Sequence, residues 1–402
     1  MGQDQDATPR EHSGAAFGLT PSPSRRSAVD PFLVMEVMRA AIDRENAGDS
    51  VIHMEVGQPG AAAPAPVIAA ARAALDDGHF GYTEALGTRV LRSRIARHYG
   101  EAHGIDLSPD RVAVTTGSSA AFNLAFLAAF DVGDRVALVT PGYPAYRNIL
   151  AALGLDVVEI ETTADSRYAL TPEMLATAHA EAPLAGVLIA SPANLTGTMM
   201  SPDALAALIS AADELGIRFI SDEIYHRLVY EGTAETALKF SEDAIIINSF
   251  SKYYCMTGWR IGWMVLPADL IRPVERISQN LYISPPDISQ RAAIAAFEST
   301  AELEGVKAGY AANRRLLLDR LPQIGFDDYS PVDGAFYVYT SVRRFSNDSV
   351  EFTRRMLAEA GVAATPGPDF DRARGSGTMR FSFAGTEADM AEAMDRIAAW
   401  LG

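Results

Sequence analysis

The chain has 402 residues, of which 48% are hydrophobic and 21% are charged, so it can bury a substantial core and we expect two domains. Its formal net charge of −17 argues against nucleic acid as a partner, because binding along a phosphate backbone needs an excess of Lys and Arg. The single cysteine, Cys255, excludes an internal disulfide framework and a cysteine metal cluster, so we expect a reducing compartment, the cytoplasm. The seven histidines lack the spacing of metal ligands, and no metal site is predicted.

The first part of the chain is polar and rich in residues that break helices and strands. It has no apolar stretch of the kind found in a signal peptide, so we interpret residues 1–29 as a flexible arm. No apolar run in the chain reaches the roughly 18 residues of a membrane span. The longest candidate, residues 120–130, is typical of a buried helix, and we do not expect the protein to cross a membrane.

Short apolar runs alternate with helical patterns through residues 58–296, which we assign to a large domain. This alternation is typical of an α/β fold in which helices cover both faces of a mostly parallel sheet. Polar residues repeatedly follow the apolar runs, at the points where strands would end. Because ligands bind at the carboxyl ends of strands in open α/β sheets, we expect these polar residues to converge on one crevice. The predicted strands are residues 111–116, 135–140, 186–190, 217–221 and 244–248.

The pattern changes to long helices and short strands beyond about residue 297. We expect residues 30–57 and 297–402 to pack together as a smaller α+β domain. The short strands also predict that Arg380 reaches inward from a sheet edge. The predicted elements are strands at residues 334–339 and 379–383 and a helix from about Asn347.

A lysine and an arginine stand out in residues 248–263. Lys252 comes just after an apolar run, and Arg260 follows one short loop later. A lysine in that position can form a Schiff base, and the arginine can hold a phosphate group. Lysines followed by arginines also occur on many solvated surfaces, so the pair alone leaves both interpretations open.

Polar motifs in a definite order accompany this pair. They are Gly57-Gln-Pro, Tyr82 with Gly87 and Leu91-Arg92, Gly117-Ser118-Ser119, Asn194, Asp222-x-x-Tyr225, Ser249-x-Ser251-Lys252, Arg260 and Arg380. Together they resemble the class I/II aminotransferases, pyridoxal-phosphate enzymes of fold type I, over about residues 30–402. The resemblance implies a seven-stranded type of sheet in the large domain. It also implies a homodimer that moves an amino group from an L-amino acid to a 2-oxo acid in a ping-pong cycle.

The resemblance implies a partner for each polar group of pyridoxal phosphate. Lys252 would form the Schiff base and then carry the Cα proton as a free amine. Asp222 would accept a hydrogen bond from the ring nitrogen and keep it protonated, so that the ring acts as an electron sink. Tyr225 and Asn194 would hydrogen-bond the phenolic oxygen, and Tyr143 would stack on the ring face.

The phosphate and the substrate have further implied partners. Tyr82 resembles the tyrosine that reaches the neighbouring subunit's phosphate, so one chain alone would have an incomplete site. Arg380 would grip the substrate carboxylate with a bidentate fork, and Gly57 would let the backbone approach the substrate. The implied phosphate partners within the chain are Ser118, Ser119, Ser249, Arg260 and the amides of the helix that follows Gly117, and Ser251 joins the cofactor-binding residues.

Two positions depart from the family pattern. Leu195 follows Asn194 where a proline with a cis bond is common, so we expect either a rarer non-proline cis bond or a rearranged loop. Cys255 stands where a smaller residue is usual, and we interpret it, like His226, as a packing residue.

Residues 276–286 bear on the choice of substrate. Family members that prefer dicarboxylic amino acids often carry a second arginine there, whereas Gln279 or a close neighbour occupies the corresponding position here. We therefore expect a neutral or aromatic amino donor, with a 2-oxo acid such as 2-oxoglutarate or pyruvate as acceptor.

Other functions use parts of the same pattern. A lyase that cleaves Cα–Cβ or Cβ–S bonds would use the same lysine, aspartate and arginines, and the sequence does not separate it from an aminotransferase. A cofactor-sensing regulator would carry a DNA-binding domain in front, for which the residues before 30 are too few and too polar. A dinucleotide-binding oxidoreductase is not indicated, because no Gly-x-Gly-x-x-Gly follows a strand.

Overall fold

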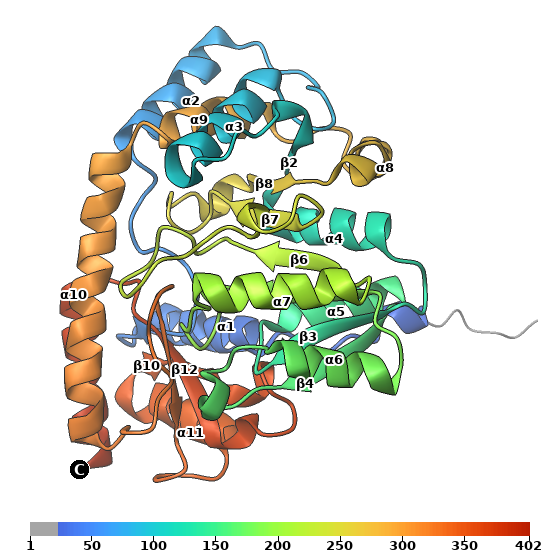
Figure 1. The fold of residues 1–402 in the computed structure, drawn as a ribbon. Coiled ribbons are helices and arrows are strands. Elements are labelled where there is room, and N and C mark those ends of the chain that lie inside the picture. Colours follow the sequence, from blue (N-terminus) through green and yellow to red (C-terminus); the bar gives the residue numbers. More distant parts are fainter. Residues whose placement is uncertain (1–22) are drawn as a thin grey trace, which may run out of the picture.

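The computed structural model describes residues 23–402, and a seven-stranded sheet forms the centre of this part (Figure 1). The strand order is β2-β8-β7-β6-β5-β3-β4, in which β8 runs antiparallel to both of its neighbours and the other strands share one direction. The predicted α/β class with a mostly parallel sheet is therefore confirmed. The strands are β2 Val112–Thr115, β3 Arg135–Thr140, β4 Asp156–Glu161, β5 Gly186–Ala190, β6 Arg218–Asp222, β7 Ile245–Ser249 and β8 Gly262–Val265.

Strands β4 and β8 were not among the individually predicted ones. β4 lies at the edge of the sheet and is only partly buried, so it lacks a continuous apolar run. Strands β6 and β7 end at Asp222 and Ser249, one residue later than predicted. Both side chains therefore belong to the ends of strands rather than to the loops that follow.

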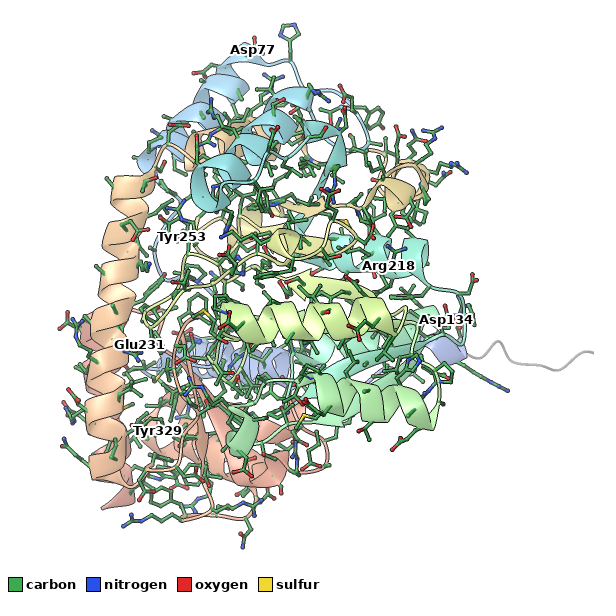
Figure 2. All side chains as sticks on the ribbon, in the orientation of Figure 1. Asp77, Asp134, Arg218, Glu231, Tyr253 and Tyr329 are labelled. Atoms are coloured by element: carbon green, nitrogen blue, oxygen red, sulfur yellow. The ribbon has the colours of Figure 1, made fainter. Side chains whose placement is uncertain are left out.

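Helices cover both faces of this sheet. Ile246 packs in one apolar cluster, whereas Ile245 and Ile247 pack in another, as expected of a strand that is buried on both faces. Side chains fill the space between the sheet and the helices (Figure 2). Helix α4 is the buried helix predicted around residues 120–130. The helices are α2 Ala65–Asp77, α3 Arg89–His103, α4 Gly117–Ala129, α5 Pro144–Leu153, α6 Pro172–Glu181, α7 Pro202–Glu214, α8 Ala268–Leu281 and α9 Asp287–Ala296.

The C-terminal part contains a three-stranded antiparallel sheet in the order β11-β12-β9. Arg380 lies on β12, the central strand, so the prediction that it reaches inward from a sheet edge is wrong. Strand β11 is only two residues long, too short to be recognised from an alternating pattern. The elements are α10 Thr300–Ile324, β9 Tyr337–Ser341, α11 Ser349–Arg355, a short π-helix Met356–Ala360, β10 Val362–Ala363, β11 Thr365–Pro366, β12 Thr378–Ser382 and α12 Glu387–Leu401.

Residues 30–57 contact this C-terminal part. Strand β1, Ile52–His53, pairs in parallel with β10, and helix α1, Leu33–Asn46, contacts β10 and β11. These contacts agree with the expected packing, and the domain boundaries stay a prediction. The predicted arm, residues 1–29, lies mostly outside the described residues. Within residues 23–402, no helix combines the length and the apolar character that a membrane span requires.

Candidate active site

Most of the predicted site residues line one cavity of about 270 Å³ at the carboxyl ends of the central strands. Three do not line it: Gly117 and Ser249 lie behind its wall, and Tyr82 is 84% exposed in the loop between α2 and α3. The strand ends therefore converge as predicted. The predicted residues that line the cavity are Gly57, Ser118, Ser119, Tyr143, Asn194, Asp222, Tyr225, Ser251, Lys252, Arg260 and Arg380.

Lys252 points its amine at the backbone of Gly57. Its Nζ donates a hydrogen bond of 2.6 Å to the Gly57 carbonyl oxygen. Burial and the nearby Arg380 guanidinium lower the pKa of Lys252 to about 8, so more of its amine is neutral near pH 7 than in an ordinary lysine. Gly57 must be a glycine here, because a Cβ atom would lie 1.9 Å from the Tyr337 hydroxyl oxygen. The arrangement presents a nucleophilic amine to the cavity.

Asp222 is a buried carboxylate at the end of β6. Its Oδ1 accepts a 3.1 Å hydrogen bond from the Ile224 N–H, and its Oδ2 accepts one from the Tyr146 hydroxyl. Burial raises the pKa of Asp222 to about 7, while these two donors oppose the rise. A cationic N–H group in the cavity would stabilise the ionised carboxylate.

Two guanidinium groups enter the cavity without carboxylate partners among residues 23–402. Arg380 is 3% exposed and donates through its two terminal nitrogens to Asn194 Oδ1 and to the Glu55 carbonyl, which leaves Nε unpaired. Arg260 donates to the Thr257 carbonyl oxygen at 3.0 Å. Arg380 is buried, and buried cations are normally paired, whereas Arg260 is exposed at the cavity. With these two cations the cavity is suited to a ligand that carries two separate anionic groups.

The start of helix α4 faces Arg260. A Cβ atom on Gly117 would lie 2.3 Å from the Arg260 guanidinium, and Gly117 has a φ of +74°, so glycine is required on both counts. The free N–H groups of this first turn, next to Ser118 and Ser119, favour an anion. Ser249 Oγ lies 2.8 Å from Ser251 Oγ, so Ser249 supports a serine that lines the cavity.

Tyr225 and Asn194 make protein contacts at the cavity wall. The Tyr225 hydroxyl shares a 2.7 Å hydrogen bond with the Tyr337 hydroxyl, and Asn194 Oδ1 accepts from Arg380 at 2.8 Å. The bond between Asn194 and Leu195 is trans, so the alternative of a non-proline cis bond is wrong. The cis peptide bonds within residues 23–402 are Thr140–Pro141 and Ser191–Pro192.

Sequence reasoning missed two tyrosines and an apolar rim. Tyr146 follows Tyr143 by three residues in the sequence, but its bond to Asp222 joins residues 76 positions apart. Tyr337 lies under the Arg380 guanidinium, 4.3 Å from its ring centre. The apolar rim residues of the cavity are Phe32, Val34, Met35, Val56 and Ile149.

Three histidines meet outside this cavity, around a larger hollow of about 520 Å³ on the other side of Ser249. The ring centre of His103 lies 6.4 Å from that of His98 and 6.1 Å from that of His226. Burial lowers the pKa of His226 to about 4, so its ring is neutral at pH 7. No group of three or more His, Cys, Asp or Glu residues within residues 23–402 could hold a metal ion.

Replacing Tyr146 by Phe is expected to move the acidic limb of the pH profile of kcat/KM upward by about one pH unit. A hydrogen bond to a charged group contributes about 1.5 kcal/mol or more, and its loss raises the pKa of Asp222. As the pH is lowered, Asp222 of the variant therefore becomes protonated at a higher pH than in the unchanged protein, and the activity that needs the ionised carboxylate is lost there. Steady-state rates from pH 5 to 10 measure this. Tyr329→Phe is the control, since its hydroxyl makes no hydrogen bond within the described residues. An unmoved acidic limb would show that Tyr146 does not tune Asp222.

Comparisons with known proteins agree on one family. Residues 49–397 match the family model described as aminotransferase class I and II. The chain is 51% identical to a valine–pyruvate aminotransferase of Mycobacterium tuberculosis, over 95% of this chain and 99% of that protein. It is 34% identical to a (5-formylfuran-3-yl)methyl phosphate transaminase of Methanocaldococcus jannaschii, over 92% and 97% of the two chains. The structure of Thermus thermophilus aspartate aminotransferase with maleate superimposes with a TM-score of 0.89 at 32% identity, covering 94% of this chain and 100% of that one.

Proposed function

The chain belongs to the class I and II aminotransferases, pyridoxal-phosphate enzymes that move an amino group from an amino acid to a 2-oxo acid, and we propose that its donor is a neutral aliphatic L-amino acid such as valine. The proposed acceptor is pyruvate. The similarity to a valine–pyruvate aminotransferase supports this pair. None of the relatives described above is a lyase or a regulator by name, so these alternatives are not favoured.

The make-up of the cavity wall carries the proposal. Its cationic side chains, within the described residues, are Lys252, Arg260 and Arg380. If these three serve the amino group, the cofactor phosphate and the α-carboxylate, none is left for a second substrate carboxylate. The rim toward Phe32 and Met35 is apolar, which suits an aliphatic side chain.

The residues present fit pyridoxal phosphate. The buried Asp222 carboxylate would hold a proton on the ring nitrogen, and Tyr143 would cover a ring face. Arg260 would pair with the phosphate, together with the first turn of α4. When bound, the cofactor supplies an electron sink that stabilises negative charge at the substrate Cα.

The chain's own residues would then perform the remaining steps. Lys252 would bond to the cofactor aldehyde and, once displaced by the donor, take the Cα proton at its Nζ. Its lowered pKa keeps part of the amine available as a base near neutral pH. Arg380 would hold the substrate carboxylate through the terminal nitrogens of its guanidinium, which donate to Asn194 Oδ1 and the Glu55 carbonyl oxygen in this structure. Asn194, which already contacts Arg380, would link the substrate end of the site to the phenolic oxygen of the cofactor.

A homodimer would complete the site. Tyr82 is 84% exposed in the single chain, so it makes little contact with its own subunit. In the dimer it would reach the phosphate of the neighbouring subunit. Other exposed apolar side chains, Phe80, Leu281 and Ile283, would pack in the same interface. Light scattering should give twice the chain mass of 43.1 kDa, and a mass of one chain would contradict the dimer.

The cytoplasm remains the proposed location, supported by the free, buried Cys255.

A panel of amino donors tests the proposed specificity. With pyruvate as acceptor, kcat/KM for L-valine should exceed that for L-aspartate by about 100-fold or more, because an unpaired carboxylate against the apolar rim loses its hydration. Initial rates with each donor at several concentrations measure this ratio. L-Leucine serves as the uncharged control of similar size to aspartate. A preference for aspartate would overturn the proposed donor class and leave the transfer reaction itself intact.

A further inference from the structure

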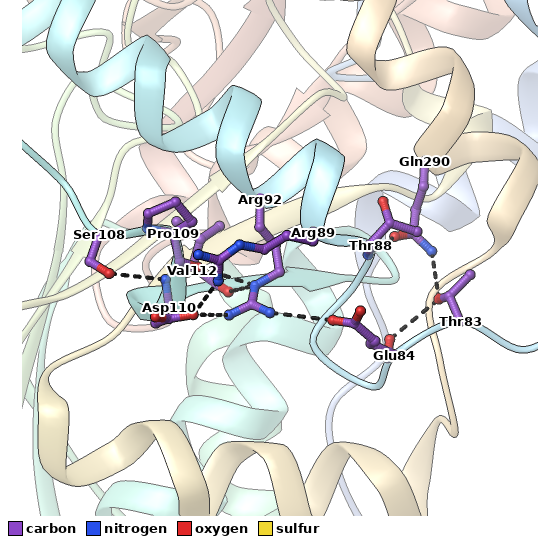
Figure 3. Close-up of polar contacts among 10 residues, drawn as sticks. All are labelled: Thr83, Glu84, Thr88, Arg89, Arg92, Ser108, Pro109, Asp110, Val112 and Gln290. Atoms are coloured by element: carbon purple, nitrogen blue, oxygen red, sulfur yellow. Dashed lines mark hydrogen bonds and ion pairs between the residues drawn. The ribbon is translucent and has the colours of Figure 1, made fainter.

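The loop that carries Tyr82 lies between α2 and α3 and has no regular secondary structure. Tyr82 itself projects from the loop, with 84% of its surface exposed. In the proposed dimer this side chain must meet a phosphate on another subunit, so its backbone has to be held in place from within its own chain. Figure 3 shows the polar contacts that surround the residues just after Tyr82.

Gln290 is the buried centre of these contacts. It lies on α9, is fully buried, and uses both ends of its side-chain amide. Its Nε2 donates to Thr83 Oγ1 at 3.0 Å and to the Pro285 carbonyl oxygen at 3.0 Å. Its Oε1 accepts from the Thr88 N–H at 2.8 Å (Figure 3). One side chain thus binds the loop at the residue that follows Tyr82 and again where the loop meets α3.

The loop fits closely around Gln290. Gly87 has a φ of +87°, and a Cβ atom there would lie 2.5 Å from Val114 Cβ and 3.1 Å from Gln290 Oε1. The Leu86 carbonyl oxygen accepts a 2.9 Å bond from the Val114 N–H, which ties the end of the loop to the central sheet. Little room remains for the loop to shift while Gln290 keeps its bonds.

A second contact reaches the loop from the other side. Arg92 is 8% exposed, and its Nε donates to the Val112 carbonyl oxygen at 2.9 Å. Its Nη1 lies 3.5 Å from the carboxylate of Glu84, which is itself largely exposed. This longer contact with an exposed carboxylate is weak. Ser278 Oγ also donates to the Ala85 carbonyl oxygen at 3.2 Å, and Ser284 Oγ accepts from the Thr83 N–H at 3.3 Å. Of these four side chains, Gln290 is the one that binds the loop both next to Tyr82 and at the start of α3.

We propose that Gln290 is a positioning residue that acts through Tyr82 on the cofactor phosphate of the neighbouring subunit. The inference rests on the proposed dimer with a shared Tyr82. Gln290 does not line the cavity of its own subunit, and through Tyr82 we expect its effect at the other site. An amide is suited to this task because one acceptor and two donors satisfy three groups of the loop and its flank without a buried charge.

Replacing Gln290 by Met, which has a similar length and no hydrogen bonds, tests the proposal. The dissociation constant for pyridoxal phosphate, titrated by absorbance on cofactor-free protein, should rise about tenfold, the change expected when one charge-assisted hydrogen bond to the phosphate is misplaced. With saturating cofactor, kcat should stay within about twofold and KM for the donor should not change, since neither reports on phosphate binding. Thr83→Val removes the same bond from the loop side and covers the case in which Gln290→Met does not fold.

Mixed dimers separate an effect on the neighbouring site from an effect on the same chain. One chain carries Lys252→Ala, so only the other chain's site is active, and two affinity tags allow the mixed dimer to be isolated. Gln290→Met on the Lys252→Ala chain should raise the cofactor concentration needed for half-maximal activity by about tenfold. The same change on the active chain should leave that concentration unaltered. The reverse pattern, or an equal effect in both arrangements, would overturn the proposal.

Two controls complete the design. Asn313→Leu removes another buried amide, which donates to the Phe383 and Gly385 carbonyl oxygens, and should lower thermal stability without weakening cofactor binding. Tyr82→Phe tests the shared tyrosine directly. An unchanged dissociation constant for Tyr82→Phe would refute the shared tyrosine and the role of Gln290 together. A raised constant for Tyr82→Phe with normal binding by Gln290→Met and Thr83→Val would refute the role of Gln290 alone.

Discussion

Lys252→Ala is expected to lower kcat by a factor of about 10⁴ or more, the largest effect of any single change in the site. The chain has only three lysines, and the other two, Lys239 and Lys307, pair with glutamates near the surface. Lys252 alone presents its amine to the cavity, where an alanine methyl group can neither bond to the cofactor aldehyde nor carry a proton. Rates with L-valine and pyruvate at saturating cofactor measure the loss.

The control for this change is Lys239→Ala, which removes an exposed ammonium 2.7 Å from Glu235 and should leave kcat within about twofold. The absorbance of the purified variants gives a second readout, because only a chain with Lys252 can retain covalently attached cofactor. Lys252→Ala protein with full turnover would refute the assignment of this lysine.

Arg380→Lys is expected to reduce kcat/KM for L-valine about 100-fold or more. The guanidinium has partners on three sides: Asn194, the Glu55 carbonyl oxygen and the Tyr337 ring. A lysine ammonium cannot keep those contacts and also offer two parallel donors to a carboxylate. Each lost charged hydrogen bond weakens binding by about 1.5 to 3 kcal/mol, so two of them account for the expected loss.

The same substitution on the surface provides the comparison. Arg354 forms an exposed ion pair with Glu351 on α11, and Arg354→Lys should leave kcat/KM within about twofold. For Arg380→Lys, kcat/KM should fall for both the amino donor and the 2-oxo acid acceptor, because each carries the carboxylate that Arg380 would bind. Unchanged kinetics with every donor and acceptor would show that Arg380 does not anchor it.

The convergence of the strand ends was predictable because it follows from local pattern. Buried parallel strands need continuous apolar runs, and the polar residues at the end of a run, such as Asp222, lie at the crevice. The central position of β12 was not predictable, because its neighbour β11 has two residues and no pattern of its own. Pairing partners of such short strands depend on tertiary contacts that a single sequence does not display.

Tyr146 and Tyr337 show a second limit of prediction from the sequence. In the sequence, Tyr146 and Tyr337 have the character of ordinary core aromatics, and both are buried as such residues usually are. Their hydroxyl groups become informative only when the fold brings them to Asp222 and Tyr225. The role of Gln290 was not predictable for the same reason. A single glutamine on a helix has no distinguishing pattern, and its contacts become visible only when the fold places a distant loop around it.

An absorbance spectrum of the purified protein, recorded before and after addition of L-valine without any 2-oxo acid, tests whether the bound cofactor accepts the amino group of this donor. The visible band of the attached cofactor should disappear, and one equivalent of the matching 2-oxo acid should be released per chain. A band that persists with valine but disappears with aspartate would contradict the proposed donor. Release of ammonia together with the 2-oxo acid would contradict transfer itself.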